Sequence, residues 1–236
     1  MTAPSSEAGQ LALDLPHTPG YELGDFLPAA SNRAALSLVL DWPRWPGPAC
    51  LLLGPPASGK SHLARIWADR AGAVLLRGAE LWEPANPLAR VGRASACAVD
   101  DADAVAEEDQ LFHLWHRIVA GGGSLLLTAS HPVPAWKLAL ADLRSRLMTA
   151  TPIRIDAPDD ELLGAILVKQ LADRQITVDT DVLGYLTRRM ERSFAAARAV
   201  VRALDRASLR ARRPITLPLA RAVLAELAAD AATGEP

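Results

Sequence analysis

The most constraining feature of this sequence is a short apolar run that leads through a glycine-rich loop into a helical pattern. Residues 49–53 are Ala-Cys-Leu-Leu-Leu, residues 54–61 are Gly-Pro-Pro-Ala-Ser-Gly-Lys-Ser, and apolar residues then recur at helical spacing to residue 71. A buried strand, a loop of the form G-x-x-x-x-G-K-S and a helix, in this order, form the pattern of a phosphate-binding loop. The sequence therefore predicts an α/β fold with a site for a nucleoside phosphate.

The residue types in this loop suit phosphate and magnesium. Glycine lets backbone N–H groups close around phosphate oxygens, and the amino end of the following helix adds positive potential. We expect Lys60 to reach the outer phosphates and Ser61 to bind Mg²⁺. The alternative is an ordinary glycine-containing turn before a helix. The residues of this segment that we expect to contact nucleotide are Gly54, Pro55, Ala57, Ser58, Gly59, Lys60, Ser61 and His62.

An acid pair follows another apolar run. Residues 96–99, Ala-Cys-Ala-Val, are followed directly by Asp100 and Asp101. We expect Asp100 to hold the magnesium shell and Asp101 to orient an attacking water. The alternative is a strand that ends in a solvated acidic turn, since Asp103 and the acids at 107–109 continue the acidic stretch.

Apolar runs and helical patterns alternate up to Pro158. Such alternation predicts a five-stranded parallel sheet with helices on both faces, and the purely helical spacing after Pro158 predicts a second, all-helical domain. Predicted strands lie at 49–53, 74–77, 96–99, 125–129 and 153–155, and predicted helices at 32–41, 60–71, 107–120, 136–146, 159–173, 179–190, 194–211 and 216–229. We therefore divide the chain into a flexible tail at 1–25, an α/β nucleotide-binding domain at 26–157 and a helical domain at 158–230.

Composition limits the class of protein. Hydrophobic residues make up 50% and charged residues 22% of the 236 residues, so we expect a folded core rather than global disorder. The formal net charge is −2, although ten arginines lie between residues 188 and 221. Two cysteines are too few for a disulfide framework, and no apolar stretch has the pattern of a signal peptide or a membrane span. We expect a cytoplasmic protein without membrane contact.

Several segments resemble those of the AAA+ ATPases, and within them the DnaA initiator family, over about 26–229. The segments that carry the resemblance are GPPASGKSHL, the VDD acid pair, DLRSRL with IRIDAPDDE, and SFAAARAVVRALDRA. The resemblance implies an AAA+ P-loop core whose five-stranded parallel sheet is followed by a helical lid. It also implies ADP or ATP as the ligand, together with Mg²⁺.

The same resemblance implies roles for residues outside the phosphate loop. Arg146 falls at the arginine-finger position and Arg198 at the sensor-2 position, while Asn32 lies near the expected adenine. Thr128 and Ser130 bracket the sensor-1 position, where DnaA relatives have Asp or Asn. Ser130 is expected to contact the nucleotide there, and this departure from the family predicts weak hydrolysis by the chain itself.

The amino-terminal segment carries a second resemblance. DnaA proteins have a longer amino-terminal region and a carboxyl-terminal helix-turn-helix domain, for which this chain has no room, so we expect an Hda-type regulatory inactivator of DnaA. Such proteins carry a clamp-binding peptide near the amino terminus, and Gln-Leu-Ala-Leu-Asp-Leu at 10–15 matches it. The expected clamp contacts are Gln10, Leu11, Leu13 and Leu15. The alternative is a short segment that packs on the ATPase core.

The implied function is nucleotide-dependent control of replication initiation. The chain would bind the sliding clamp, which is the β subunit of the DNA polymerase, and reach DNA through it. It would then supply Arg146 to ATP-bound DnaA, so that DnaA hydrolyses its nucleotide. For Arg146 the alternative is a local pair with an acid such as Asp142. For the whole chain the alternatives are a helicase-loader-like AAA+ ATPase and a small P-loop kinase, and self-association is left open.

Overall fold

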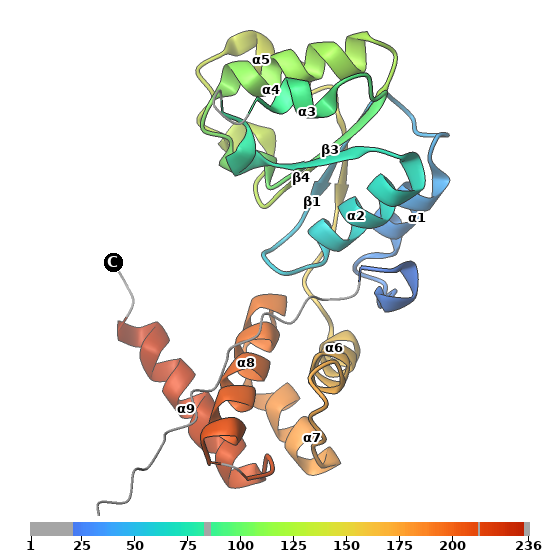
Figure 1. The fold of residues 1–236 in the computed structure, drawn as a ribbon. Coiled ribbons are helices and arrows are strands. Elements are labelled where there is room, and N and C mark those ends of the chain that lie inside the picture. The colour runs from blue at the N-terminus through green and yellow to red at the C-terminus, as the bar shows by residue number, and fades with distance from the viewer. Residues whose placement is uncertain (1–20, 83–85, 212, 234–236) are drawn as a thin grey trace, which may run out of the picture.

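The chain folds as a parallel sheet between two layers of helices, followed by a separate group of four helices (Figure 1). The computed structural model describes residues 21–82, 86–211 and 213–233. The strands are β1 (Ala49–Leu53), β2 (Val74–Arg77), β3 (Ala96–Asp100), β4 (Ser124–Ala129) and β5 (Thr151–Arg154). The α-helices are α1 (Arg33–Asp41), α2 (Lys60–Ala71), α3 (Pro87–Val91), α4 (Glu108–Trp115), α5 (Ala141–Leu147), α6 (Asp160–Ala172), α7 (Thr180–Arg189), α8 (Phe194–Ala211) and α9 (Leu217–Thr233).

The strand order places the ends of β1, β3 and β4 next to one another. The sheet runs β2-β3-β4-β1-β5, and each pair of neighbours is parallel. Because parallel strands all end at the same edge, the segments that follow Leu53, Asp100 and Ala129 meet there. This edge is where open α/β sheets bind their ligands.

Side chains along each strand alternate between two apolar layers. Leu51 and Leu127 belong to the layer that α4 and α5 complete, whereas Leu52 and Leu126 belong to the layer that α1 and α2 complete. Figure 1 shows these helices on opposite faces of the sheet. Burial on both faces explains why the strands read as continuous apolar runs rather than as alternating patterns.

Helices α6 to α9 bury a core of their own. Leu167 of α6, Leu186 of α7 and Val201 of α8 are among the residues that meet in it. The first of these helices begins at an N-cap, where the Asp159 carboxylate accepts a hydrogen bond from the Leu162 N–H at 2.7 Å. Within the described ranges, no helix combines the length and apolarity that a membrane span needs.

The structure confirms the predicted α/β core with five parallel strands, followed by an all-helical part. The predicted helix at 136–146 is wrong in its first half, since α5 begins only at Ala141. The physical reason is a distant acceptor: the N–H groups of Ala139 and Leu140 each donate to the Glu108 carboxylate at 2.8 Å instead of to helical carbonyls.

Other helical segments also differ from the sequence prediction. The helix expected over 107–120 changes at His116 into a π-helical turn that ends at Ala120. The short helix α3 was not predicted, and α9 continues past residue 229 to Thr233. Local periodicity carries little information at such helix ends, where a single hydrogen bond decides the boundary.

Residues 21–25, which we assigned to the flexible tail, have a defined structure. Leu23–Asp25 form a 3-10 helix, and the carbonyl of Glu22 lies 3.0 Å from Nε2 of His62 at the start of α2. The ring of Tyr21 packs edge-on against the ring of His62, with centroids 5.4 Å apart. These residues therefore belong with the folded part of the chain.

Gly78 allows β2 and β3 to end in close contact. A Cβ atom at Gly78 would lie 2.1 Å from the carbonyl oxygen of Asp101, which is a backbone atom that cannot move aside cheaply. We expect Gly78→Ala to lower the free energy of unfolding by about 1–3 kcal/mol, the usual cost of overpacking. Thermal or urea unfolding measures this. The matched control is Gly164→Ala inside α6, where the nearest atom lies 4.0 Å away and helix propensity favours alanine. Equal stability of wild type and Gly78→Ala would contradict the close approach.

Candidate nucleotide site

The phosphate loop is a tight turn between β1 and α2. Two of its residues have left-handed backbone conformations, Ala57 with φ 63° and Gly59 with φ 92°. A Cβ atom at Gly54 would lie 2.8 Å from Oγ of Ser58 and 3.0 Å from Cβ of Ile155. The loop therefore closes on itself so tightly that a side chain at position 54 would fill its interior.

The Lys60 ammonium lies inside this turn. The residue is only 5% exposed, and Nζ donates to the carbonyl oxygens of Gly54 at 2.8 Å and Pro55 at 2.9 Å. Burial lowers the pKa of Lys60, while the charges of the acids at 101, 103 and 100 act in the opposite direction. Both hydrogen-bond partners of the ammonium are neutral carbonyls. A phosphate bound in the loop would therefore form a direct ion pair with Lys60.

Ser58 shows that the loop fits a phosphate group. Its Oγ is buried and has no hydrogen-bond partner among the described residues. A buried hydroxyl without a partner costs free energy, so this position calls for a polar ligand. The unpartnered Ser58, the buried Lys60 and the side-chain-free space at Gly54 are together the features that a bound phosphate requires.

Thr128 connects the acid pair to β4. It is completely buried, and its Oγ1 donates to Oδ1 of Asp100 at 2.6 Å and accepts from the N–H of Asp101 at 2.9 Å. Our sequence analysis named Thr128 only as a neighbour of the sensor-1 position. The signal that could have identified it is a hydroxyl residue inside the otherwise apolar run 125–129.

The two acids of the pair have different environments. Asp100 is 9% exposed and bonds to Thr128, whereas Asp101 has a left-handed backbone with φ 53°. Burial raises the pKa of Asp101, and the charge of Asp100 adds to the rise. A carboxylate with a raised pKa is better able to take a proton from water, which suits the role predicted for Asp101.

Ser130 is positioned through its backbone. Its N–H donates to Oδ2 of Asp103 at 2.9 Å, and the same oxygen accepts from the N–H of His131 at 3.1 Å. Asp103, which the sequence analysis did not name as a site residue, thus fixes the turn that follows β4. Ser61 at the start of α2 is exposed at the same edge of the sheet, where it was predicted to bind Mg²⁺.

No cluster of three or more His, Cys, Asp or Glu side chains suitable for a metal ion occurs in the described part of the chain.

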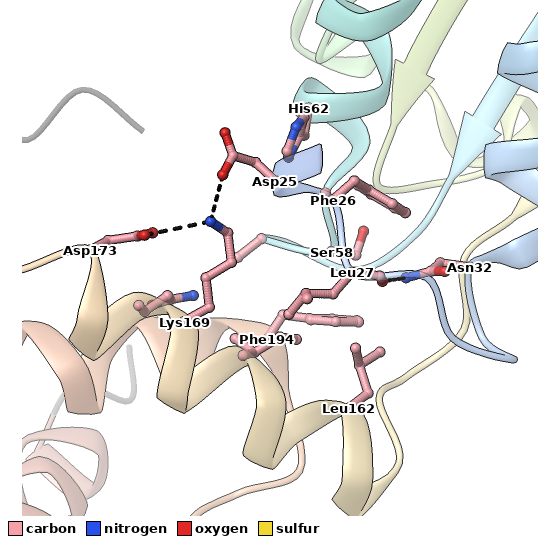
Figure 2. Close-up of a pocket in the computed structure, with 14 residues that line it drawn as sticks. Asp25, Phe26, Leu27, Asn32, Ser58, His62, Leu162, Lys169, Asp173 and Phe194 are labelled. Atoms are coloured by element: carbon pink, nitrogen blue, oxygen red, sulfur yellow. Dashed lines mark hydrogen bonds and ion pairs between the residues drawn. The ribbon is translucent and has the colours of Figure 1, made fainter. Parts of the chain in front are cut away.

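A cavity of about 680 Å³, counting its open mouth, separates the phosphate loop from α6 (Figure 2). Asn32 lies in its wall, 3% exposed. Its Nδ2 donates to the carbonyl of Leu27 at 2.9 Å and its Oδ1 accepts from the N–H of Ala29 at 2.8 Å, so Asn32 holds the loop that forms this wall. The lining residues are Asp25, Phe26, Leu27, Asn32, Ala57, Ser58, Gly59 and His62 from the α/β part, and Leu162, Ile166, Lys169, Gln170, Asp173 and Phe194 from the helical part.

One ion pair crosses the cavity. Nζ of Lys169 on α6 donates to Oδ1 of Asp25 at 2.8 Å and lies 3.5 Å from Oδ1 of Asp173. Figure 2 shows the Lys169 ammonium between the two carboxylates. The pair joins residues 144 positions apart in the sequence, and it links the amino-terminal segment to the lid.

This ion pair predicts a pH-dependent contribution to stability. The hydrogen bond from Lys169 lowers the pKa of Asp25 below its usual 3.8. The contribution is therefore present above pH 4 and lost as the pH falls through the lowered pKa of the folded state. We expect Lys169→Met to lower the melting temperature at pH 5 to 7, and the difference from wild type to shrink below about pH 4. The control is Lys137→Met, an exposed lysine. A difference that does not change with pH would argue against the ion pair.

Two predicted site residues lie away from this cavity. Arg198 is on α8, one turn beyond Phe194, and its side chain is exposed and not part of the lining. Arg146 on α5 pairs with Asp142, with Nε and Nη2 each 3.1 Å from a carboxylate oxygen, and its guanidinium lies over the ring of Phe112. The local pair that we considered as an alternative for Arg146 therefore exists. The predicted clamp contacts Gln10, Leu11, Leu13 and Leu15 lie outside the described residues.

The helical lid matches a known family. Residues 159–224 match the family model for the Hda lid domain. The helical part of the chain is therefore similar to the Hda lid domain, and the chain as a whole is similar in fold to domain III of DnaA.

Solved structures of DnaA and RuvB have a similar fold. The chain is similar to domain III of the replication initiation protein DnaA from Thermotoga maritima, with a TM-score of 0.73 and 15% identity over 90% of this chain and 98% of that one. AMPPCP-bound DnaA from Aquifex aeolicus gives a TM-score of 0.64 at 15% identity, over 79% of this chain and 65% of that one. The Holliday junction branch migration motor RuvB of Thermotoga maritima has a TM-score of 0.66 and 17% identity, over 88% of this chain and 72% of that one.

One curated relative has a higher identity. An uncharacterized protein of Haemophilus influenzae is 27% identical over 189 residues, which is 75% of this chain and 81% of the relative.

Proposed function

We propose that this Hda-like chain binds ADP or ATP with Mg²⁺ and acts as a negative regulator of replication initiation, in which it binds the sliding clamp and stimulates ATP hydrolysis by DnaA. The observation that carries nucleotide binding is the buried Lys60, held by neutral carbonyls beside the unpartnered Ser58. The Hda-type lid at 159–224 supports the regulatory role. The DnaA likeness supports adenine as the base, since one of the similar structures is bound to AMPPCP.

In this proposal each group has a task. The loop N–H groups and Lys60 would bind phosphate oxygens, and Ser61 and Asp100 would be the Mg²⁺ ligands, with Asp100 oriented by Thr128. Asp101 would accept a hydrogen bond from the attacking water. Bound MgATP supplies the phosphoanhydride bond that is hydrolysed. Ser130, in contrast, offers only a hydroxyl near the γ-phosphate position, so hydrolysis by this chain alone is slow.

Nucleotide binding is tested at Lys60. Removing a buried cation that contacts phosphate should weaken binding of ADP or ATP by several kcal/mol, that is, at least 100-fold. Isothermal titration calorimetry of Lys60→Ala against wild type measures this, and saturating ADP should raise the melting temperature of wild type only. Arg65→Ala, an exposed residue on the same helix, is the control. Equal ADP affinity in Lys60→Ala and wild type would refute the site.

Arg146 can act on a neighbouring molecule at little cost to this chain. Its pair with Asp142 is four residues apart on one helix, and the two side chains are 33% and 61% exposed. Exposed pairs of this kind are worth only about 0.3–0.5 kcal/mol. A γ-phosphate on DnaA would compete easily for the guanidinium, so the local pair and the role in trans are compatible.

The regulatory role is tested by single-turnover hydrolysis of DnaA-bound ATP in the presence of DNA-loaded clamp. We expect Arg146→Ala to bind nucleotide and clamp normally but to lose the stimulation, because an arginine finger in trans is worth about 10³ or more in rate. Arg144→Ala is the control, an exposed arginine two residues away. Gln10→Ala with Leu13→Ala should lose stimulation through lost clamp binding. Equal stimulation by Arg146→Ala and wild type would remove the finger role.

A further inference from the structure

The outward face of α8 carries a row of arginines. Arg198, Arg202, Arg206 and Arg210 follow one another at intervals of four residues, and all four side chains are exposed. The opposite face of the helix packs into the lid core through Ala197, Val200, Val201 and Leu204. With 3.6 residues per turn, Arg206 lies directly opposite the centre of this buried face. The row is therefore the most solvent-accessible side of the helix.

These four arginines lack acidic partners. No ion pair or hydrogen bond joins their side chains to any other residue that the structure describes. Asp205, the single acid of α8, is engaged by Arg174 at 3.7 Å. The positive charge of the row is thus not neutralised within the lid, although the net charge of the whole chain is −2.

The spacing of the row suits a regular polyanion. Four residues of α-helix advance about 6 Å and turn by about 40° beyond one full turn, so the row is about 18 Å long and winds slowly around the helix. Each strand of duplex DNA carries one phosphate per about 3.4 Å of its axis. The part of the row from Arg202 to Arg210 is about 12 Å long and spans about three to four phosphates of one strand. The planar guanidinium binds phosphate oxygens in pairs.

The composition of the same face argues against a protein partner. Ala195 precedes the row and Ala199 lies within it, and the face has one large apolar side chain, Leu209, which is 62% exposed. Stable protein interfaces have an apolar or aromatic centre, which a single leucine does not supply. Nucleic-acid backbones need only cations and close approach, which small alanines between arginines permit.

We propose that Arg202, Arg206 and Arg210 form a contact surface for the sugar-phosphate backbone of double-stranded DNA, without base specificity. Arg198 is left out because the family resemblance assigns it to nucleotide. The duplex is favoured over a single strand because the arginines are held on one rigid helix and no aromatic side chain lies on this face of α8 for bases to stack on. The surface makes DNA a direct ligand of the lid, and it does not depend on nucleotide or clamp binding.

The test is the salt dependence of DNA binding by the full chain. Fluorescence anisotropy with a labelled mixed-sequence duplex of 20 base pairs is measured between 50 and 200 mM NaCl. Each lost phosphate contact lowers the slope of log K against log salt by about 0.9. Arg202→Ala with Arg206→Ala and Arg210→Ala should therefore lower it by about 2.7. Raising NaCl from 50 to 200 mM weakens DNA binding by wild type by some factor. For the triple alanine variant, the corresponding factor should be roughly 40 times smaller.

Two further variants keep the result interpretable. Arg65→Ala with Arg70→Ala and Arg93→Ala removes the same charge from exposed positions of the α/β part and should keep the wild-type slope. Arg202→Lys with Arg206→Lys and Arg210→Lys retains the three charges and should also keep the wild-type slope, even if the alanine variant folds poorly.

Four outcomes would overturn the proposal. The first two are no binding of the duplex by wild type, and a slope lowered as much in the control triple as in the Arg202, Arg206 and Arg210 variant. The third is tighter binding of a single strand than of the duplex. The fourth is displacement of the labelled duplex by poly-glutamate as readily as by unlabelled duplex, which would indicate an acidic protein as the partner.

Discussion

A buried ammonium group determines the local structure at the edge of the sheet. Lys60 is 5% exposed, and a charged amine removed from water needs oxygen atoms around it. The carbonyls of Gly54 and Pro55 supply them at 2.8 and 2.9 Å. To aim two carbonyls at a side chain only five and six residues ahead, the backbone has to turn sharply, and Ala57 and Gly59 take left-handed conformations there. The phosphate loop is thus shaped around its lysine.

The acidic side of the site depends on packing rather than on local sequence. Thr128 and Asp100 are 28 residues apart, yet their oxygens lie 2.6 Å from each other because β3 and β4 are neighbours in the sheet. Asp101 follows in a left-handed turn against Gly78 at the end of β2. Three strands therefore hold two carboxylates in fixed and different environments, and the burial of Asp101 in its turn raises its pKa.

The sequence was most informative where the chain repeats a local pattern. The bounds of β1, β2 and α2 were predicted correctly from apolar runs and helical spacing. The hydrogen bond between Thr128 and Asp100 and the ion pair between Lys169 and Asp25 were not, because their partners come together only through tertiary structure. The helix start at Ala141 was missed for the same reason, since it depends on Glu108. The likeness to DnaA anticipated the lid, but not which of its side chains line the cavity.

The ion pair between Asp25 and Lys169 has a geometric consequence for the amino-terminal segment. By holding residues beside the cavity, it anchors the chain at a defined point, from which only six residues lead back from Tyr21 to Leu15. A fully extended chain spans at most about 3.5 Å per residue, so Leu15 lies within about 21 Å of Tyr21 whatever conformation these residues adopt. A molecule that binds Leu15 is therefore tethered to the folded part of the chain by a span of at most this length.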